Sequence, residues 1–113
     1  MMFGSKEQKV LHLIQKGKWE ELNRRYLNSD AETRLMLAQE CSKANDPGVN
    51  SILTTLIRDS DKRVQLAAVK SIAITGKDHE VAQLQWLLSN TPEENGELLI
   101  AIHEAISNVR GKR

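Results

Sequence analysis

One stretch of the 113-residue chain limits its fold more than any other: residues 59–76, DSDKRVQLAAVKSIAITG, predict a helix with almost no face suited to water. Apolar and small side chains recur at helical spacing along one side, and Leu66, Val69 and Ala73 fall on roughly the opposite side. The clearly hydrophilic positions within it are Lys62, Arg63, Gln65 and Lys70. A helix that is apolar nearly all round must be covered on several sides. The stretch therefore predicts the middle layer of a helical stack.

The size and charge of the chain restrict its class. Its length suits one domain with a core of its own. The 16 Lys and Arg against 15 Asp and Glu leave a formal charge of +1, which removes the general attraction of a strongly basic chain to nucleic acid or anionic membrane. Cations are in excess over residues 1–28, whereas the last predicted helix is acidic. Opposite signs at the two ends leave a homodimer through the ends as one option.

Cysteine use and hydropathy indicate the compartment. A single cysteine, Cys41, excludes an internal disulfide framework and is typical of a reducing environment. The N-terminal residues lack the apolar run of a signal peptide, and no segment approaches the ~20 apolar residues of a membrane span. We therefore expect a cytoplasmic protein without a membrane partner.

Helix signals recur along the chain, and strand signals are missing. No run of β-branched and aromatic residues alternates with polar ones. Ser5, Asp30 and Asp61 stand where N-caps are expected, Gly17 stands where a helix ends, and residues 91–94 (TPEE) resemble a capping box. The sequence predicts an all-α protein whose helices span residues 5–16, 18–28, 31–44, 47–58, 61–75, 78–89 and 91–109.

An internal repeat separates a solenoid from an ordinary bundle. A shift of 31 residues lays SDAETRLMLAQECSKAND, from Ser29, onto SDKRVQLAAVKSIAITGK, from Ser60. The last helix joins at a shift of 34. A bundle has no reason to repeat its caps and core at one period, whereas stacked hairpins do. We expect a divergent capping unit at 5–28, repeats at 29–59 and 60–90, and a closing half-repeat at 91–109.

The repeated residues carry a family resemblance. The pattern Asp61-x-x-Val64-x-x-Ala67-Ala68-x-x-x-Ile72-x-x-x-Gly76, followed by Val81-x-x-Leu84-x-x-Leu87-Leu88, resembles a unit of the short bacterial HEAT repeats, the kind found in HEAT-like domains related to phycobilin-lyase subunits. The resemblance implies an α-α superhelix, a short right-handed solenoid of about three helical hairpins. It also implies that helices 31–44, 61–75 and 94–109 line the concave side and that helices 47–58 and 78–89 lie outside.

One feature of the family is incomplete in this chain. HEAT repeats of this kind usually place Arg after the Val of the inner helix, where it pairs with an Asp of a neighbouring unit. Arg34 matches, but Gln65 and Leu99 stand at the equivalent positions. The resemblance therefore implies a single contact of this type, from Arg34 to Asp61.

No residue pattern indicates catalysis. His12, His79 and His103 lie on separate segments without the spacing of a metal site. Cys41 takes the position of Ile72 in the repeat, and a thiol in an apolar environment has a raised pKa and is inert. There is no GxSxG elbow and no Gly-rich phosphate loop. We expect no enzyme activity, no metal and no cofactor.

A second stripe on the inner helices is the candidate binding site. It consists of positions that are equivalent across the units: Leu35, Leu66 and Ile100, then Ala38, Val69 and His103. These residues either pack between neighbouring units or form a shallow apolar strip, flanked by Lys62 and Lys70, for an amphipathic helix or an extended peptide. Trp86 is either an exposed binding anchor or a cover for the last helix.

We expect a protein–protein interaction or scaffolding module that binds an unidentified protein or peptide on the inner helices. The candidate partner-binding residues are Arg34, Leu35, Lys62, Leu66, Val69, Lys70, Ile100, His103 and Trp86. Two alternatives remain open. A nucleic-acid-binding HEAT-like protein would need a concave face crowded with cations, and carboxylates such as Glu32, Glu40 and Glu104 argue against it. A non-catalytic accessory subunit of a lyase-like enzyme would carry a bound chromophore or substrate.

Overall fold

Helices make up all the regular structure of residues 5–44 and 46–111, the part of the chain that the structure, a computed structural model, describes. In chain order the elements are α1 (Lys6–Gln15), α2 (Trp19–Arg25), α3 (Ala31–Cys41), α4 (Val49–Leu56), α5 (Lys62–Thr75), α6 (Val81–Ser89) and α7 (Gly96–Arg110). A 3-10 turn, η1 (Asp78–Glu80), leads into α6. The prediction of an all-α fold is confirmed.

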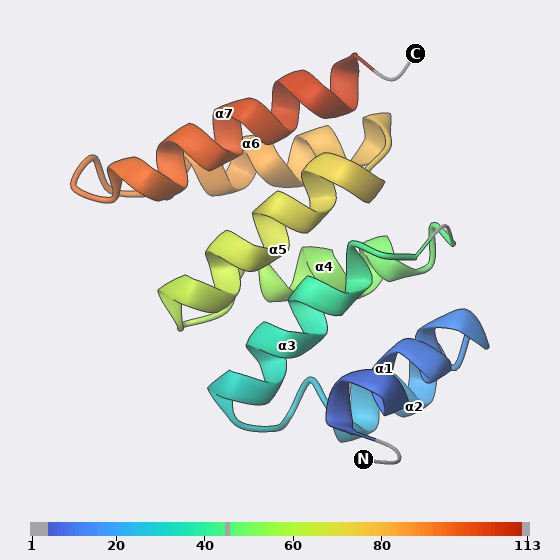
Figure 1. The fold of residues 1–113 in the computed structure, drawn as a ribbon. Coiled ribbons are helices and arrows are strands. Elements are labelled where there is room, and N and C mark those ends of the chain that lie inside the picture. The colour runs from blue at the N-terminus through green and yellow to red at the C-terminus, as the bar shows by residue number, and fades with distance from the viewer. Residues whose placement is uncertain (1–4, 45, 112–113) are drawn as a thin grey trace.

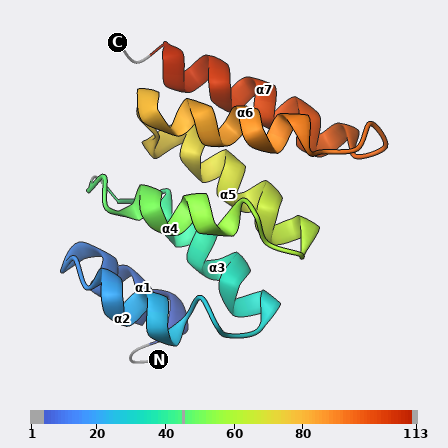
Figure 2. The same cartoon turned by 180° about the vertical axis from the view of Figure 1, so that it is seen from behind.

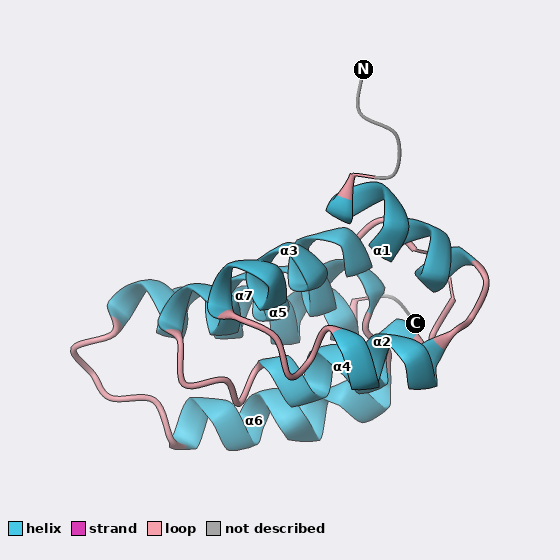
Figure 3. Ribbon diagram, turned by 90° about the horizontal axis from the view of Figure 1, so that it is seen from below, coloured by secondary structure: helices cyan, strands magenta, loops and turns pink. Residues whose placement is uncertain are grey.

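The helices form two layers that run side by side along the molecule (Figure 1). The view from below separates α1, α3, α5 and α7 from α2, α4 and α6 (Figure 3). We name the first set the inner layer and the second set the outer layer, which faces the viewer from behind (Figure 2). Within the inner layer α1 packs on α3, α3 on α5 and α5 on α7, and the outer helices α2, α4 and α6 pack on α1, α5 and α7, respectively. This is the arrangement of a helical solenoid, as the repeat predicted.

Helix α5 lies at the centre of the stack. It contacts α3 on one side and α7 on the other, and the outer helix α4 covers a third side (Figure 1). Val64, Ala68 and Ile72 of α5 are completely buried. Full burial of an aliphatic side chain of this size stabilises a fold by about 1.5–3 kcal/mol relative to leaving it in water. The prediction that residues 61–75 form the middle helix of the stack is confirmed.

Two buried polar contacts fix how α5 meets its neighbours. The Ser71 hydroxyl donates to the carbonyl of Ala38 on α3 across 2.6 Å, and both side chains are small enough to let the two helices approach closely. At the other side, Asn50 of α4 donates from Nδ2 to the Thr75 carbonyl across 3.1 Å, while the Thr75 hydroxyl donates to Asn50 Oδ1 across 2.7 Å. Each contact satisfies groups that would be costly to bury unpaired.

The helix starts follow the predicted caps. Ser5 accepts a hydrogen bond from the Gln8 amide at 3.2 Å, and Asp30 accepts one from the Thr33 amide at 3.0 Å. Asp61 accepts from the amide of Arg63 at 2.8 Å. Gly17 ends the first hairpin arm with a φ of 69°, a conformation that glycine adopts without a side-chain clash.

Several predicted boundaries are wrong. Helix α3 ends at Cys41 rather than near residue 44, α4 spans Val49–Leu56 rather than 47–58, and residues 78–80 form a 3-10 turn before α6. Helix α2 ends at Arg25 rather than near residue 28, because Tyr26 to Asn28 form turns. Helix α7 begins at Gly96, because the TPEE segment does not act as a capping box. The Thr91 hydroxyl instead donates back to the Leu87 carbonyl at the end of α6 across 2.6 Å. Residues 91–95 are therefore a connecting turn.

Gly48 gives a test of the packing between the first hairpin and α4. A Cβ at Gly48 would lie 2.4 Å from Cε2 of the Trp19 indole, although the backbone there, with φ −57° and ψ −26°, suits alanine. We predict that Gly48→Ala displaces the ring and lowers the free energy of unfolding by about 1–3 kcal/mol. Urea unfolding followed by circular dichroism measures the loss, and Trp19 emission in a Trp86→Phe background reports the displacement.

Gly96→Ala is the matched control, because nothing lies within 4 Å of the position that a Cβ would take there. It should leave the indole emission unchanged and should not destabilise the fold. Equal stability of the Gly48→Ala and Gly96→Ala variants would contradict the proposed packing.

The N-cap carboxylates predict an acid dependence of stability. Hydrogen bonding from Thr33 lowers the pKa of Asp30, and hydrogen bonding from Arg63 lowers the pKa of Asp61, in each case below the ordinary value of 3.8. A group whose pKa is lowered by folding stabilises the fold above its unfolded pKa and loses that contribution as the pH falls through its folded pKa. We therefore expect the melting temperature to fall below about pH 4 and these two groups to have no effect above about pH 5.

The double variant Asp30→Asn/Asp61→Asn isolates the charge, because asparagine still caps a helix. Its melting temperature should depend less steeply on pH between about pH 5 and pH 3 than that of the wild-type protein. Identical slopes would show that these caps are not responsible for the acid sensitivity.

Candidate functional site

An apolar hollow on the inner layer lies between α3 and α5, and we name it the α3/α5 groove. It has a volume of about 400 Å³. Helix α3 contributes Leu35, Gln39 and Ser42, and α5 contributes Arg63, Leu66, Ala67, Lys70, Ser71 and Ile74. The α5 residues recur three and four positions apart, so they occupy one face of that helix. The groove exists because small residues on this face let the two helices approach while larger ones flank the contact.

The apolar residues of the groove differ in exposure. Leu35 and Leu66 are half-buried, since each packs on the core with part of its side chain and lines the groove with the rest. Ile74 is 61% exposed, which is unusual for a large aliphatic side chain at the end of a buried helix. The two sequence interpretations of Leu35 and Leu66, core packing and groove lining, therefore describe two sides of the same residues.

An ion pair closes one end of the groove. The Arg63 guanidinium lies 2.6 Å from Glu32 of α3 and 3.1 Å from Asp61, and the hydrogen bonds that it donates to Asp61 and Glu32 raise its pKa above the ordinary value. Because Arg63 and Glu32 are 55% and 70% exposed, we assign the ion pair between them little effect on stability. The effect of the cluster is local, because Glu32 and Asp61 already balance the charge of Arg63.

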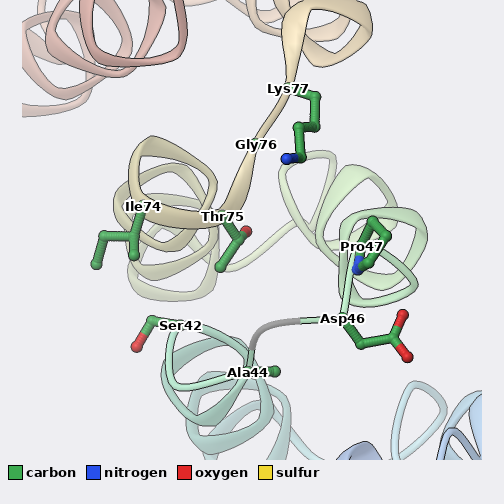
Figure 4. A pocket seen from close by; sticks show the side chains of 8 residues that line it. All are labelled: Ser42, Ala44, Asp46, Pro47, Ile74, Thr75, Gly76 and Lys77. Atoms are coloured by element: carbon green, nitrogen blue, oxygen red, sulfur yellow. The ribbon is translucent and has the colours of Figure 1, made fainter. Parts of the chain in front are cut away.

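The opposite end opens into a second hollow of about 240 Å³ beside the C-terminus of α5. Ser42 and Ile74, which also line the groove, lie on one side of this hollow, and Pro47 lies on the other (Figure 4). Lys77 directs its ammonium group towards it (Figure 4). The two hollows therefore adjoin each other at Ser42 and Ile74, along the inner side of α5.

A third hollow, of about 480 Å³, runs between α1 and α3 and shares Leu35 and Gln39 with the α3/α5 groove. We name it the α1/α3 groove. Its charged lining residues are Lys6, Glu7, Asp30, Glu32 and Glu40. Carboxylates therefore outnumber cations here, whereas the charged residues that line the α3/α5 groove, within the described chain, are Arg63 and Lys70.

Comparison with known proteins bears on the fold and the family. A family model for HEAT repeats matches residues 21–106, which is more than half of the chain. The chain belongs to the HEAT repeat family. No curated protein and no solved structure matches it significantly. HEAT repeats generally mediate protein–protein interaction or scaffolding and are typically not catalytic.

The HEAT-type arginine makes a different contact from the one that the resemblance implied. Arg34 pairs with Asp59 rather than Asp61, through Nε to Oδ2 at 2.7 Å and Nη2 to Oδ1 at 3.1 Å. Its Nη1 also donates to the Ser29 carbonyl at 2.5 Å. Asp61 is not available because it caps α5 and binds Arg63. The hydrogen bonds to Asp59 raise the pKa of Arg34. The same hydrogen bonds hold the start of α3 to the connection between α4 and α5.

The next HEAT unit replaces both members of this pair by neutral residues. Gln65 takes the place of Arg34, and Asn90 takes the place of Asp59 at the same shift of 31. Gln65 donates to the Ile57 carbonyl across 3.0 Å, and Asn90 donates to the Trp86 carbonyl across 2.8 Å. In this unit both the arginine and the aspartate of the family's pair are therefore replaced, so no charge is left without a partner.

The other predicted partner-binding residues do not all converge. Val69 is completely buried, so it is not a surface residue. Lys62 is exposed and lines a separate hollow with Pro92, Glu94 and Asn95. Ile100, 62% exposed, and His103, also exposed, lie on α7 beyond the α3/α5 groove. The groove brings together Leu35, Leu66 and Lys70 from the predicted set.

Trp86 belongs to the outer layer. It is 42% exposed on α6, and the Arg58 guanidinium lies 4.0 Å from the centre of its ring. Arg58 also donates to Gln83 across 3.0 Å, so it ties the end of α4 to α6. Trp86 is therefore separate from the inner-layer surface.

Ile74 was not among the residues that the sequence indicated for binding. The equivalent positions in the other repeats hold Lys43 and Asn108, so Ile74 is not part of the repeated apolar pattern. That departure was the available signal, because an apolar residue where the repeat has polar ones is not needed for stacking. Such a residue is a better candidate for a binding role than those that the repeat conserves internally.

Metal-binding geometry is not found in the part of the chain that the structure describes. Burial raises the pKa of Cys41 to about 12, with the nearby Glu40 charge adding to the effect, so the thiol is inert as predicted. No cluster of His, Cys, Asp and Glu within residues 5–44 and 46–111 could hold a metal ion. None of the described helices is long and apolar enough to span a membrane.

The Arg34–Asp59 pair can be tested with the substitutions that the next repeat carries. Only 19% of the Arg34 side chain and 9% of the Asp59 side chain are exposed, so Asp59→Asn should lower the free energy of unfolding by about 1–3 kcal/mol. We predict that Arg34→Gln/Asp59→Asn is less destabilised than the sum of its single variants, because no charge is left without a partner. Urea unfolding of the wild-type protein, the two single variants and the double variant measures this difference.

Glu32→Gln is the control, since it removes an ion pair of Arg63 that is exposed. Its unfolding midpoint should stay close to that of the wild-type protein. Strict additivity of the Arg34 and Asp59 variants would mean that the two side chains do not depend on each other.

Proposed function

We propose that this HEAT repeat chain is a non-catalytic interaction module that binds a partner protein on its inner layer. The observation that carries the proposal is the apolar surface left on that layer. Among the described residues, the large hydrophobic side chains that are exposed are Ile74, Trp86 and Ile100, and two of these belong to inner helices. The half-buried Leu35 and Leu66 line the α3/α5 groove of this layer together with Ile74.

The energetics of this surface favour a protein partner. Apolar area removed from water contributes roughly 25 cal/mol per Å², so a partner that covers Ile74 and Ile100 gains from each. Contiguous apolar surface with a polar margin is typical of protein–protein interaction sites. The half-buried leucines add rigidity, because their inner sides are held by the core.

The charges of the inner layer support a protein partner over a nucleic acid. Arg34 and Arg63 are already bound to Asp59 and to Glu32, respectively. A nucleic-acid surface would need several unpaired cations to displace counterions from phosphates. The carboxylates of the α1/α3 groove would in addition repel a phosphate backbone.

Affinity capture tests the proposal. We predict that the double variant Ile74→Asp/Ile100→Asp, used as bait in a lysate of the source organism, loses the proteins that the wild-type chain retains, by at least roughly tenfold in quantitative mass spectrometry. Both side chains are exposed, so the fold should persist, and circular dichroism melting checks this.

Thr55→Asp/Gln85→Asp is the matched control, since it places the same charges at exposed positions of the outer helices α4 and α6. It should retain the captured proteins. Retention by the folded inner-layer variant, or equal loss by both variants, would contradict binding on the inner layer.

A further inference from the structure

We propose that the α3/α5 groove binds an acidic amphipathic helix of the partner protein. This inference rests on the proposed function and deepens it, because it states the shape and charge of the segment that the inner layer accepts. It follows from three features of the groove: its length, the position of its apolar residues and the sign of its unpaired charge.

The dimensions of the groove suit a short helix. Its α5 side runs from Arg63 to Ile74. At 1.5 Å per residue, this stretch is roughly 16 Å long, or about three helical turns. The ion pair between Arg63 and Glu32 limits one end, and the hollow beside Lys77 leaves the other end open (Figure 4). A partner helix of about three turns or slightly more can therefore lie along α5.

The apolar residues are spaced for a helix laid into a groove. Leu35 stands on the α3 side, Leu66 stands on the α5 side, and Ile74 follows Leu66 two turns further along. A partner helix covers such a row with apolar residues at positions i, i+3 or i+4, and i+7. Ile74 gains most from this contact, because it is the most exposed of the three.

Lys70 supplies the unpaired charge. It is exposed midway between Leu66 and Ile74, and its ammonium group forms no ion pair with any carboxylate of the described chain. Arg63 lines the same groove but is already neutralised by Glu32 and Asp61. A carboxylate on the partner helix, one turn from its apolar contacts, can therefore pair with Lys70, and Lys77 favours a second one near the open end.

The neighbouring α1/α3 groove adds a second constraint on where the partner helix can carry its charges. Across Leu35 and Gln39, the α1/α3 groove holds Glu7, Asp30 and Glu40 beside a single cation, Lys6. Carboxylates on a partner helix are drawn towards Lys70 of α5 and repelled by the carboxylates of the α1/α3 groove. The acidic flank of that helix must then face α5, so the two grooves together fix its orientation as well as its charge.

Selection from a phage-displayed library of randomised 16-residue, helix-forming peptides tests the inference without prior choice of a sequence. We expect the peptides enriched on the wild-type protein to carry an apolar i, i+3 or i+4, i+7 stripe flanked by Asp or Glu. An enriched peptide should bind Lys70→Glu and Ile74→Asp each roughly tenfold more weakly by fluorescence titration. Selection on Lys70→Glu should instead enrich peptides with Lys or Arg on that flank.

Two variants serve as matched controls. Ile100→Asp alters a side chain as exposed as Ile74, at 62% against 61%, that lies outside the groove. Lys62→Glu reverses an exposed lysine of the same helix that lines a different hollow. Both should bind the enriched peptides with affinity close to wild type.

The results separate this inference from the proposed function. Enrichment of neutral or basic peptides, no enrichment at all, or equal weakening by Ile74→Asp and Ile100→Asp would overturn the acidic-helix proposal. Loss of captured proteins by the inner-layer double variant would still support the interaction function in that case. Capture that is unaffected by that variant would overturn the function itself.

Discussion

The structure depends on the need to cover α5 on three sides at once. A helix with so few polar positions is stable only where α3, α7 and α4 all remove its side chains from water. Each of these helices also has apolar surface on the side away from α5, and the next unit of the stack must cover it. The end units finish the stack by presenting a polar outer side to water. Full burial of Val69 is the direct sign of this coupling. The stack is therefore one cooperative unit rather than a row of independent hairpins.

Polar groups decide how closely the helices approach one another. Ser71 bonds to a carbonyl of α3, Asn50 and Thr75 bond to each other between α4 and α5, and Arg34 bonds to Asp59 across the connection between units. Every buried polar side-chain atom of the described chain has a partner. These bonds contribute modest net free energy, but losing one partner leaves the other unsatisfied in a dry environment. They therefore fix one packing arrangement among several that the apolar residues alone would allow.

The candidate surface is a by-product of this packing. Small residues between α3 and α5 bring the helices together, and Leu35 and Leu66, too large to enter the contact, line the groove above it. Stacking accounts for those two leucines, but it does not account for Ile74 or for the unpaired Lys70. A surface that holds both an unexplained aliphatic residue and an unbalanced charge has features that the fold itself does not require, which is why binding is the better explanation of them.

The sequence by itself determined the helices, most of their caps, the repeat and the inert Cys41, because each depends on spacing within a few residues or on one constant shift. It also singled out Leu35 and Leu66, which hold equivalent positions in the repeat, and Lys70, which lies one turn after Leu66. Only the tertiary structure decided that Arg34 meets Asp59, that α7 starts at Gly96, that Val69 is covered and that Ile74 is not. These outcomes depend on which of several nearby groups lies within hydrogen-bond or van der Waals distance once helices far apart in sequence are stacked. Local spacing does not specify those distances.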